Sequence, residues 1–242
     1  MNKRFVFVVF CTALMASSCF PVRVTQVRGS GNLKTDTRRV SNFNSVQLSG
    51  VGTLVITQGD REGLEITADD NILAYVESNV FGRNLNLGVQ DFINIQPSAN
   101  IVYQLTVREL ENIETSGVGQ VDLKEFSGED LTIAISGSGS VDISDLAAES
   151  LEMKVSGMGD VQISGAVKDQ RVEISGAGDY DASDLESETA QVEISGVGSA
   201  QVWATRSLDV ELSGMGNVFY YGDPSVATET SGAGSIEALG EK

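Results

Sequence analysis

The stretch Leu131-Thr-Ile-Ala-Ile-Ser-Gly-Ser-Gly-Ser-Val-Asp-Ile143 contains the features that decide the fold. Apolar and polar residues alternate on both sides of a Ser-Gly-x-Gly tetrapeptide, and this period of two is typical of strands with one buried face. The two glycines allow a tight corner, either through a positive φ or through close approach of another backbone segment. We therefore expect Gly157 and Gly176, which occupy this corner in later copies, to tolerate a side chain less well than Gly165, which lies outside it.

The same pattern recurs along the second half of the chain. The tetrapeptide has an upstream copy at Ser49 and then seven copies spaced by 18 to 20 residues, which begin at Ser116, Ser136, Ser156, Ser175, Ser195, Ser213 and Ser231. One short coil cannot bury its apolar face, whereas stacked coils bury a continuous column. The sequence predicts an all-β fold, a right-handed parallel β-helix (β-solenoid) with about seven coils of 18–20 residues. At about 4.8 Å per coil, the column would be about 30 Å tall.

Residues 40–115 lack the regular repeat but keep short alternating segments, such as Leu54-Val-Ile56, between Gly- or Asn-rich turns. The run Asp69-Asp70-Asn71 before Ile72 predicts a helix cap followed by one or two helical turns. Terminal repeats are usually atypical because they shield the end of the column. We therefore interpret residues 40–115 as an irregular N-terminal β cap on the regular solenoid of residues 116–242, with a separate small β domain as the alternative.

The N-terminus predicts export. A basic Met-Asn-Lys-Arg segment precedes an apolar run from Phe5 to Met15, which is typical of a secretory signal. The run is shorter than the roughly 20 residues that a membrane-spanning helix needs. Ala16-Ser17-Ser18-Cys19 resembles the lipobox of bacterial lipoproteins, in which the cysteine becomes the diacylated N-terminus. We expect a signal peptide over residues 1–18 and lipidation at Cys19, with ordinary cleavage as the alternative.

The formal net charge of −18 is unevenly distributed. Residues 19–39 hold five basic side chains against Asp36, whereas nine basic residues face 33 acidic ones from Val40 onward. We expect residues 19–39 to form a basic tether beside the membrane. The acidic remainder would repel nucleic acid, whose binding depends on Lys and Arg, so we expect no nucleic-acid partner. The same acidity also favours solubility.

Residue types that usually carry chemistry are scarce. The chain has no histidine, and of its two cysteines Cys11 lies in the predicted signal peptide. This removes the usual ligands of zinc, haem and iron–sulfur clusters and the commonest general base. The residues six after each repeat serine form a polar ladder, and a cation bound along it is a minor alternative: Asp122, Asp142, Gln162, Asp181 and Gln201. We expect no enzyme, no catalytic residue, no cofactor and no metal site.

Three segments and the repeats together carry a family resemblance. Phe43-Asn-Ser-Val46, Ser49-Gly-Val-Gly52 and Ile56-Thr-Gln-Gly59, followed by the serial tetrapeptides, resemble the putative auto-transporter adhesin head GIN domain family over about residues 40–240. That family is abundant in lipoproteins of Bacteroidota-type bacteria. The resemblance implies a β-helical fold, an extracytoplasmic place and no catalytic residues. It favours an outer-membrane-anchored lipoprotein of the cell envelope, in which periplasmic and surface-facing orientations both stay open.

One outer face of the predicted column gathers aromatic residues. Residues five and seven after each serine are apolar and should point inward, so those six and eight after it should point outward. Phe219 replaces a polar residue at the sixth position, and Trp203 and Tyr221 replace Lys or Ser at the eighth. Exposed aromatic groups tend to mark contact surfaces, and flat rings with a polar tip suit sugars or proteins. We expect a binding face here, unless these rings turn inward or the chain's tail covers them.

These features favour a membrane-tethered binding module or adhesin with a glycan or protein ligand. A structural envelope component that forms homo-oligomers end to end is the second hypothesis. A β-helical polysaccharide-active enzyme is the third, and it rests on analogy of fold alone. Lys and Arg are sparse in the repeats, and the acids are spread along the column rather than clustered around a groove.

Overall fold

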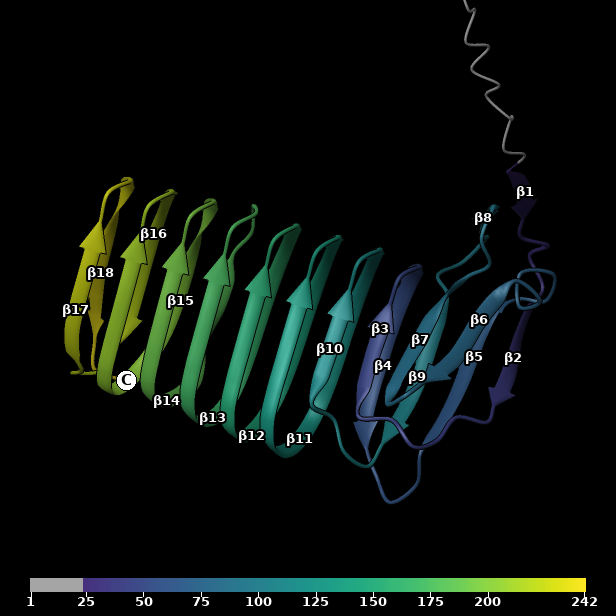
Figure 1. The fold of residues 1–242 in the computed structure, drawn as a ribbon, viewed down its shortest axis with the longest axis horizontal. Coiled ribbons are helices and arrows are strands. Elements are labelled where there is room, and N and C mark those ends of the chain that lie inside the picture. The colour runs from purple at the N-terminus through teal and green to yellow at the C-terminus, as the bar shows by residue number, and fades with distance from the viewer. Residues whose placement is uncertain (1–23) are drawn as a thin grey trace, which may run out of the picture.

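The computed structural model describes residues 24–242, so the predicted signal peptide and Cys19 lie outside the described part. The described residues form strands, turns and loops without a helix. The strands stack into a parallel β-solenoid of about six turns, which the seven regular corners delimit (Figure 1). The predicted all-β solenoid fold is confirmed.

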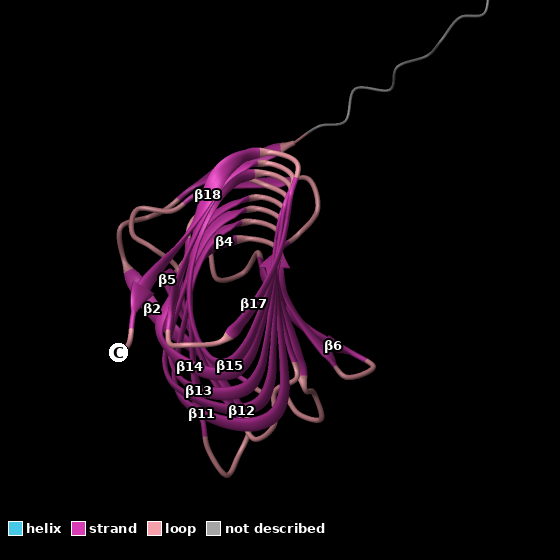
Figure 2. Ribbon diagram, turned by 90° about the vertical axis from the view of Figure 1, so that its left-hand side faces the viewer, coloured by secondary structure: helices cyan, strands magenta, loops and turns pink. Residues whose placement is uncertain are grey.

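The strands of the regular part are β10 (Asn112–Thr115), β11 (Val118–Ile135), β12 (Ser138–Val155), β13 (Met158–Ile174), β14 (Tyr180–Ile194), β15 (Val197–Leu212), β16 (Met215–Tyr221), β17 (Ser225–Thr230) and β18 (Ala233–Gly240). The long strands β11 to β15 each run from one glycine corner round the coil to the next, and shorter strands stand at the two ends. Seen along the solenoid axis, the corners form a row of loops at one edge of the coil (Figure 2).

The apolar column follows directly from the alternation in the sequence. Val121, Val141 and Val161 lie in register on adjacent strands and are buried. Asp142, one residue after Val141, points outward and is exposed. Burying a Val or Ile side chain contributes about 1.5–3 kcal/mol. A shift by one residue would move every apolar side chain to the outer face, so this pattern fixes the register.

A buried polar cluster interrupts the apolar column in the coil that contains Tyr180. Tyr180 occupies the place held by Val161 in the preceding coil and is buried. Gln170 donates a hydrogen bond from Nε2 to the Tyr180 hydroxyl at 2.6 Å, and Ser187 donates one to the Trp203 carbonyl at 2.7 Å. Burial raises the pKa of Tyr180 far above its ordinary value. The hydrogen bonds let these polar groups lie inside the column without unsatisfied partners.

The glycine corners depend on close approach between coils. A Cβ on Gly176 would meet the carbonyl oxygen of Gly157 and the backbone of Ser156 at distances that real Cβ atoms do not show. Neither Gly157 nor Gly176 has a positive φ, so close packing is the role observed for these two glycines, whereas Gly52 of the upstream corner combines a φ of +137° with close packing. The expectation for Gly165 was wrong. It has a φ of +132° and lies against the Leu146 backbone at a register shift, so it too excludes a side chain.

The N-terminal part continues the same hydrogen-bonded stack. Its strands are β1 (Thr25–Arg28), β2 (Leu33–Arg38), β3 (Ser45–Leu48), β4 (Val51–Gln58), β5 (Gly63–Asp69), β6 (Val76–Phe81), β7 (Asn84–Val89), β8 (Ile93–Gln96) and β9 (Val102–Val107). β3 and β4 pair in parallel with β10 and β11, so the upstream Ser49 corner stacks directly on the Ser116 corner.

The first rung of the solenoid comes later in the chain than the second. β7 and β9 pair with β3 and β4 on the side away from the repeats. The antiparallel strands β6, β5 and β2 then cover this end of the stack. Of these strands, the covering strand β2 comes first along the chain, and the second rung (β3 and β4) follows. The covering strands β5 and β6 come next, then β7 and β9 of the first rung, and only then the repeats.

The residues expected to form a tether are folded from Thr25 onward. β1 pairs with β8 and β2 pairs with β5, so residues 25–38 belong to the cap of the solenoid rather than to a free basic linker. Pairing partners far along the chain fix these strands, which local charge and composition do not reveal.

The helix expected after Asp69-Asp70-Asn71 is not formed, and that prediction was wrong. Residues 70–75 make a turn that leads into β6. The buried Asp69 carboxylate accepts hydrogen bonds from the Ser98 amide at 2.9 Å and the Gly31 amide at 2.8 Å. The Ser98 hydrogen bonds are the main cause of the lowered pKa of Asp69. Because this carboxylate joins the β1–β2 and β8–β9 loops, it is not free to cap a helix.

Candidate binding surfaces

The structure brings the three predicted aromatic residues together. Trp203 of β15 lies in register with Tyr221 of β16, and Phe219 stands two residues before Tyr221 on the same strand face. Neighbouring strands lie about 4.8 Å apart, and alternate residues along a strand about 7 Å apart. All three side chains are half-buried. They form one cluster on the outer surface of the C-terminal coils, called the aromatic face below.

The aromatic face points outward, as the alternation predicted. Val202 and Ala204, the neighbours of Trp203 along the strand, are fully buried, whereas Trp203 is half-buried. Lys242 crosses this surface. Its Nζ lies 5.0 Å from the centre of the Tyr221 ring and 5.7 Å from that of Trp203. Cation–π attraction at such distances contributes about 0.5–1 kcal/mol at exposed sites.

Lys242 is held in place by groups of β14. Its ammonium pairs with the Asp184 carboxylate and donates to the Ser183 carbonyl oxygen. The tail thus covers part of the aromatic face, which was the alternative weighed from the sequence, while the rings stay on the outer side. Sequence reasoning gave no signal for Lys242, because its partners lie 58 and 59 residues away.

The polar ladder lies in register on the outside of the coils. Asp122 pairs with Asp142, Asp142 with Gln162, and Asp181 with Gln201. The Gln120 side-chain amide donates a hydrogen bond to the Asp122 carboxylate at 2.7 Å, and this bond stabilises the negative charge of Asp122. Within residues 24–242, no group of three or more His, Cys, Asp or Glu is arranged to hold a metal ion. The ladder presents carboxylates and amides in register on the outer surface.

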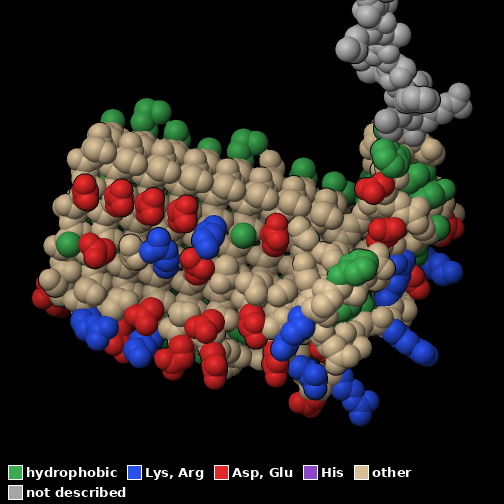
Figure 3. All heavy atoms as spheres, viewed as in Figure 1, with side chains coloured by type: hydrophobic (Ala, Val, Ile, Leu, Met, Phe, Trp, Pro, Cys, Tyr) green, Lys and Arg blue, Asp and Glu red, His purple; other side chains and the backbone are tan. Residues whose placement is uncertain are grey.

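A second acidic row lies on the opposite sheet, and the sequence analysis did not single it out. Four glutamates stack on successive strands, and Figure 3 shows a row of acidic side chains along this face: Glu173, Glu193, Glu211 and Glu229. Together with Asp209, three of them line a shallow hollow of about 300 Å³. Stacked like charges repel one another. The signal was available in Val172-Glu-Ile174, Val192-Glu-Ile194 and Val210-Glu-Leu212, whose central glutamates fall at the same register position in successive coils.

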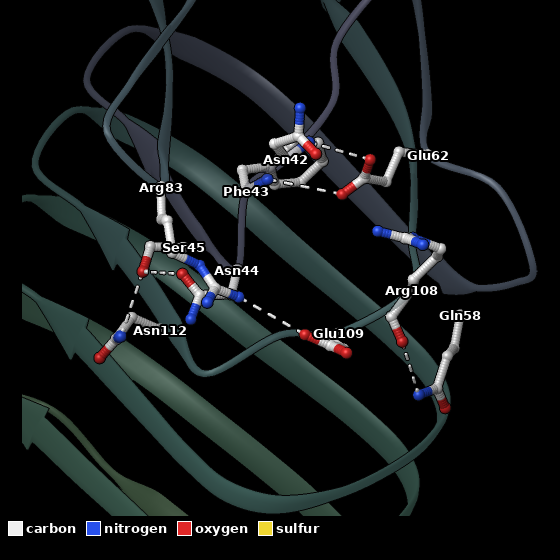
Figure 4. A network of polar contacts seen from close by, with 10 residues as sticks. All are labelled: Asn42, Phe43, Asn44, Ser45, Gln58, Glu62, Arg83, Arg108, Glu109 and Asn112. Atoms are coloured by element: carbon white, nitrogen blue, oxygen red, sulfur yellow. Dashed lines mark hydrogen bonds and ion pairs between the residues drawn. The ribbon is translucent and has the colours of Figure 1, made fainter.

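A mixed-charge hollow of about 300 Å³ lies at the N-terminal end (Figure 4). Glu62 accepts hydrogen bonds from the amides of Asn42 and Phe43, at 3.0 and 3.4 Å. Arg83 and Glu109 form an ion pair at 3.4 Å, and both side chains are mostly exposed. Exposed pairs contribute little to stability. Phe43 is buried and lines this hollow. The hollow therefore lies beside the Phe43-Asn-Ser-Val46 motif, at the start of β3.

The described residues contain no helix that is long and apolar enough to cross a membrane. The fold and the surfaces described above define a repeat solenoid with an aromatic cluster and acidic rows on its outer faces.

The chain belongs to the family described as "Putative auto-transporter adhesin, head GIN domain", whose model matches residues 42–224. This confirms the resemblance noted from the sequence. No match was found among curated proteins.

Solved structures of Bacteroides and Parabacteroides proteins share the fold. A "putative adhesin" from Bacteroides fragilis NCTC 9343 is 27% identical, with a TM-score of 0.85 over 88% of this chain and 100% of that chain. A "putative lipid binding protein" from Parabacteroides distasonis ATCC 8503 is 22% identical, with a TM-score of 0.70 over 89% of this chain and 100% of that chain. A "putative adhesin" from the same strain is 23% identical, with a TM-score of 0.66 over 88% of this chain and 100% of that chain.

Proposed function

We propose that this chain is a lipid-anchored, non-catalytic binding protein of the cell envelope, which holds a glycan or protein ligand on the aromatic face. The observation that carries this proposal is the placement of Trp203 beside Tyr221 on adjacent strands, with Phe219 two residues before Tyr221, on the outer surface of the coils. Ring faces of this kind stack on sugars and on apolar parts of proteins. The family description and the names of its solved relatives, which refer to adhesins, support the same class of function.

The titratable groups support binding rather than catalysis. Catalytic groups usually combine a shifted pKa with a place in a cleft. Among the described residues, the side chains whose pKa is clearly shifted are Asp69, Tyr103 and Tyr180. Asp69 joins two loops, and both tyrosines lie in the apolar column. None of the three faces the aromatic face or the acidic rows.

The aromatic face should be required for ligand binding. We expect the double substitution Trp203→Ala and Tyr221→Ala to weaken binding on glycan and envelope-protein arrays at least tenfold. Removing half-buried rings should cost less stability than truncating a core residue, so the variant should stay folded by circular dichroism. Phe81→Ala is the matched control, because Phe81 is 71% exposed at the other end of the molecule. Unchanged binding by the double variant would assign the ligand to another surface.

The anchor should depend on Cys19. In a bacterial host with lipoprotein processing, labelled fatty acid should enter the wild-type chain, and Cys19→Ala should abolish this labelling. The variant should also leave the membrane fraction. A Ser17→Ala variant, which keeps the cysteine, is the control and should still be labelled. Equal membrane retention of the Cys19→Ala chain would contradict a lipid anchor.

A further inference from the structure

The residue between the two glycines of each corner points away from the column, and it is exposed in six of the eight corners and half-buried at Val51 and Ser138. These residues stack in register along the whole solenoid. From the N-terminal to the C-terminal end they are Val51, Val118, Ser138, Met158, Ala177, Val197, Met215 and Ala233. At about 4.8 Å per rung, the row is about 34 Å long. We call this row the corner ridge.

The corner ridge is uncharged, and it is apolar at every position except Ser138. Val118 and Met158 are each 62% exposed, Met215 is 60% exposed and Val197 is 51% exposed. Each is flanked by Ser-Gly on one side and Gly on the other, so no charged side chain stands on the ridge itself. Figure 3 shows apolar side chains along the upper edge of the repeats, above the acidic row. Large apolar side chains exposed in a continuous line are unusual on a soluble surface.

The chain enters the fold at the N-terminal end of the corner ridge. β1 pairs with β8, and Pro97, directly after β8, lines the same shallow hollow as Val51, Val118 and Met158. Figure 1 places β1 and β8 at the edge of the solenoid that carries the corners. Val24, the first described residue, follows Cys19 by five residues. An extended chain of five residues spans at most about 18 Å. A lipid on Cys19 would therefore hold this edge close to the bilayer.

We propose that the corner ridge lies on the membrane surface, so that the solenoid axis runs parallel to the bilayer that holds the Cys19 lipid. This inference rests on the proposed anchor. Exposed Val and Met side chains would enter the boundary between headgroups and acyl chains, as apolar faces of surface-bound proteins do. The short link raises the local concentration of the ridge at the bilayer, so even weak apolar contacts are made.

The charge distribution fits this orientation. The carboxylates of the polar ladder and of the glutamate row stand on the strands between the corners and not on the ridge. With the uncharged ridge toward the lipid, the acidic rows point sideways and away from lipid phosphates. Trp203 lies six residues beyond Val197 along β15, about 20 Å further along the strand. The aromatic face would thus stay accessible above the surface.

The test places one fluorescent label on the ridge. Cys19 is replaced by a hexahistidine anchor that binds nickel-chelating lipid, and the described residues contain no cysteine that would compete for the label. The residue 19–242 chain then carries Met158→Cys or Met215→Cys, each with an environment-sensitive dye. Glu129→Cys, exposed near the opposite bend of the coil, is the matched control. On phosphatidylcholine vesicles we expect both ridge labels to shift to the blue and to be quenched severalfold by doxyl-lipid, and the control label to stay unquenched.

Two results would overturn the proposal. Equally weak quenching at residues 158, 215 and 129, with the chain fully attached, would mean that the ridge does not contact lipid. Energy transfer between ridge labels of different chains, without quenching by doxyl-lipid, would assign the ridge to a second copy. A variant with Val118, Met158 and Val197 all changed to Ser, labelled at Ser138→Cys, should lose the blue shift. Because the histidine anchor replaces the lipid, failure of acylation at Cys19 counts against the anchor alone, and this experiment still decides the orientation.

Discussion

Replacing Gly176 with Ala should lower the free energy of unfolding by about 2–3 kcal/mol, the cost of overpacking a tight site. The new Cβ would meet the Gly157 carbonyl oxygen and the Ser156 backbone. Both belong to the preceding coil, whose hydrogen bonds to the corner, such as that from the Gly176 amide to the Val155 carbonyl at 3.1 Å, leave the backbone little room to move. Urea denaturation of the purified chain measures the effect, and Gly157→Ala should behave in the same way.

Gly63→Ala is the matched control for the corner. Gly63 begins β5, has no positive φ, and a Cβ built on it meets nothing within 4 Å. At such a site the substitution reduces the entropy of the unfolded chain and is neutral or stabilising by about 0.4–1 kcal/mol. The free energy of unfolding should therefore fall in Gly176→Ala and stay the same or rise in Gly63→Ala. Similar small effects at Gly176 and Gly63 would show that the corners do not depend on close approach of adjacent coils.

The regular coils could be predicted from the sequence because their signal is local and repeated. The alternation around each tetrapeptide fixes which side chains point inward. The period of 18 to 20 residues fixes which residues of adjacent coils lie in register. The register pairs of Val121, Val141 and Val161 follow from these two facts alone. The eighth copy at Ser49 even marks the rung on which the first regular coil is built.

The cap could not be predicted in the same way, since its pairings join segments that share no repeat. β7 and β9 form the first rung although they follow the second rung in the chain, and no local pattern indicates this exchange. Asp69 shows the same limit. Its position before an apolar segment favours a helix cap, but tertiary hydrogen bonds to Gly31 and Ser98 decide its role.

The candidate surfaces were predictable to different degrees. Outward alternation identified Trp203, Phe219 and Tyr221, because strand geometry places them on one face. Lys242 reaches that face through a contact between distant segments, for which the sequence holds no signal. The corner ridge was visible in principle as Val or Met between the glycines of five of the eight copies. The direction of those side chains, however, depends on how the corner folds, and two backbone arrangements were open before the structure was known.

Raising the pH above 10 should destabilise the protein steeply, because two tyrosines are buried in neutral form. Burial raises the pKa of Tyr103 to about 12, and a weaker influence of the Arg38 charge opposes this shift. Burial also raises the pKa of Tyr180, by more than for Tyr103. An unfolded tyrosine ionises near pH 10. Between pH 10 and about 12, the unfolded chain therefore binds fewer protons than the native one, and stability falls as pH rises.

Each of the two tyrosines should contribute a slope of about 1.4 kcal/mol per pH unit in this window, or about 2.7 kcal/mol for both. Tyr103→Phe and Tyr180→Phe should each reduce the slope by about half of this sum, which denaturant unfolding from pH 9 to 12 measures.

The two variants should differ in stability at pH 7. Tyr103 has no hydrogen-bond partner for its hydroxyl within the described residues, so its loss costs little. Loss of the Tyr180 hydroxyl leaves the buried Gln170 amide unsatisfied, which costs about 1–3 kcal/mol. Phe126→Leu, a core change without a phenol, should lower stability and leave the slope unchanged; a slope that falls equally in this control would show that the tyrosines do not cause the alkaline unfolding.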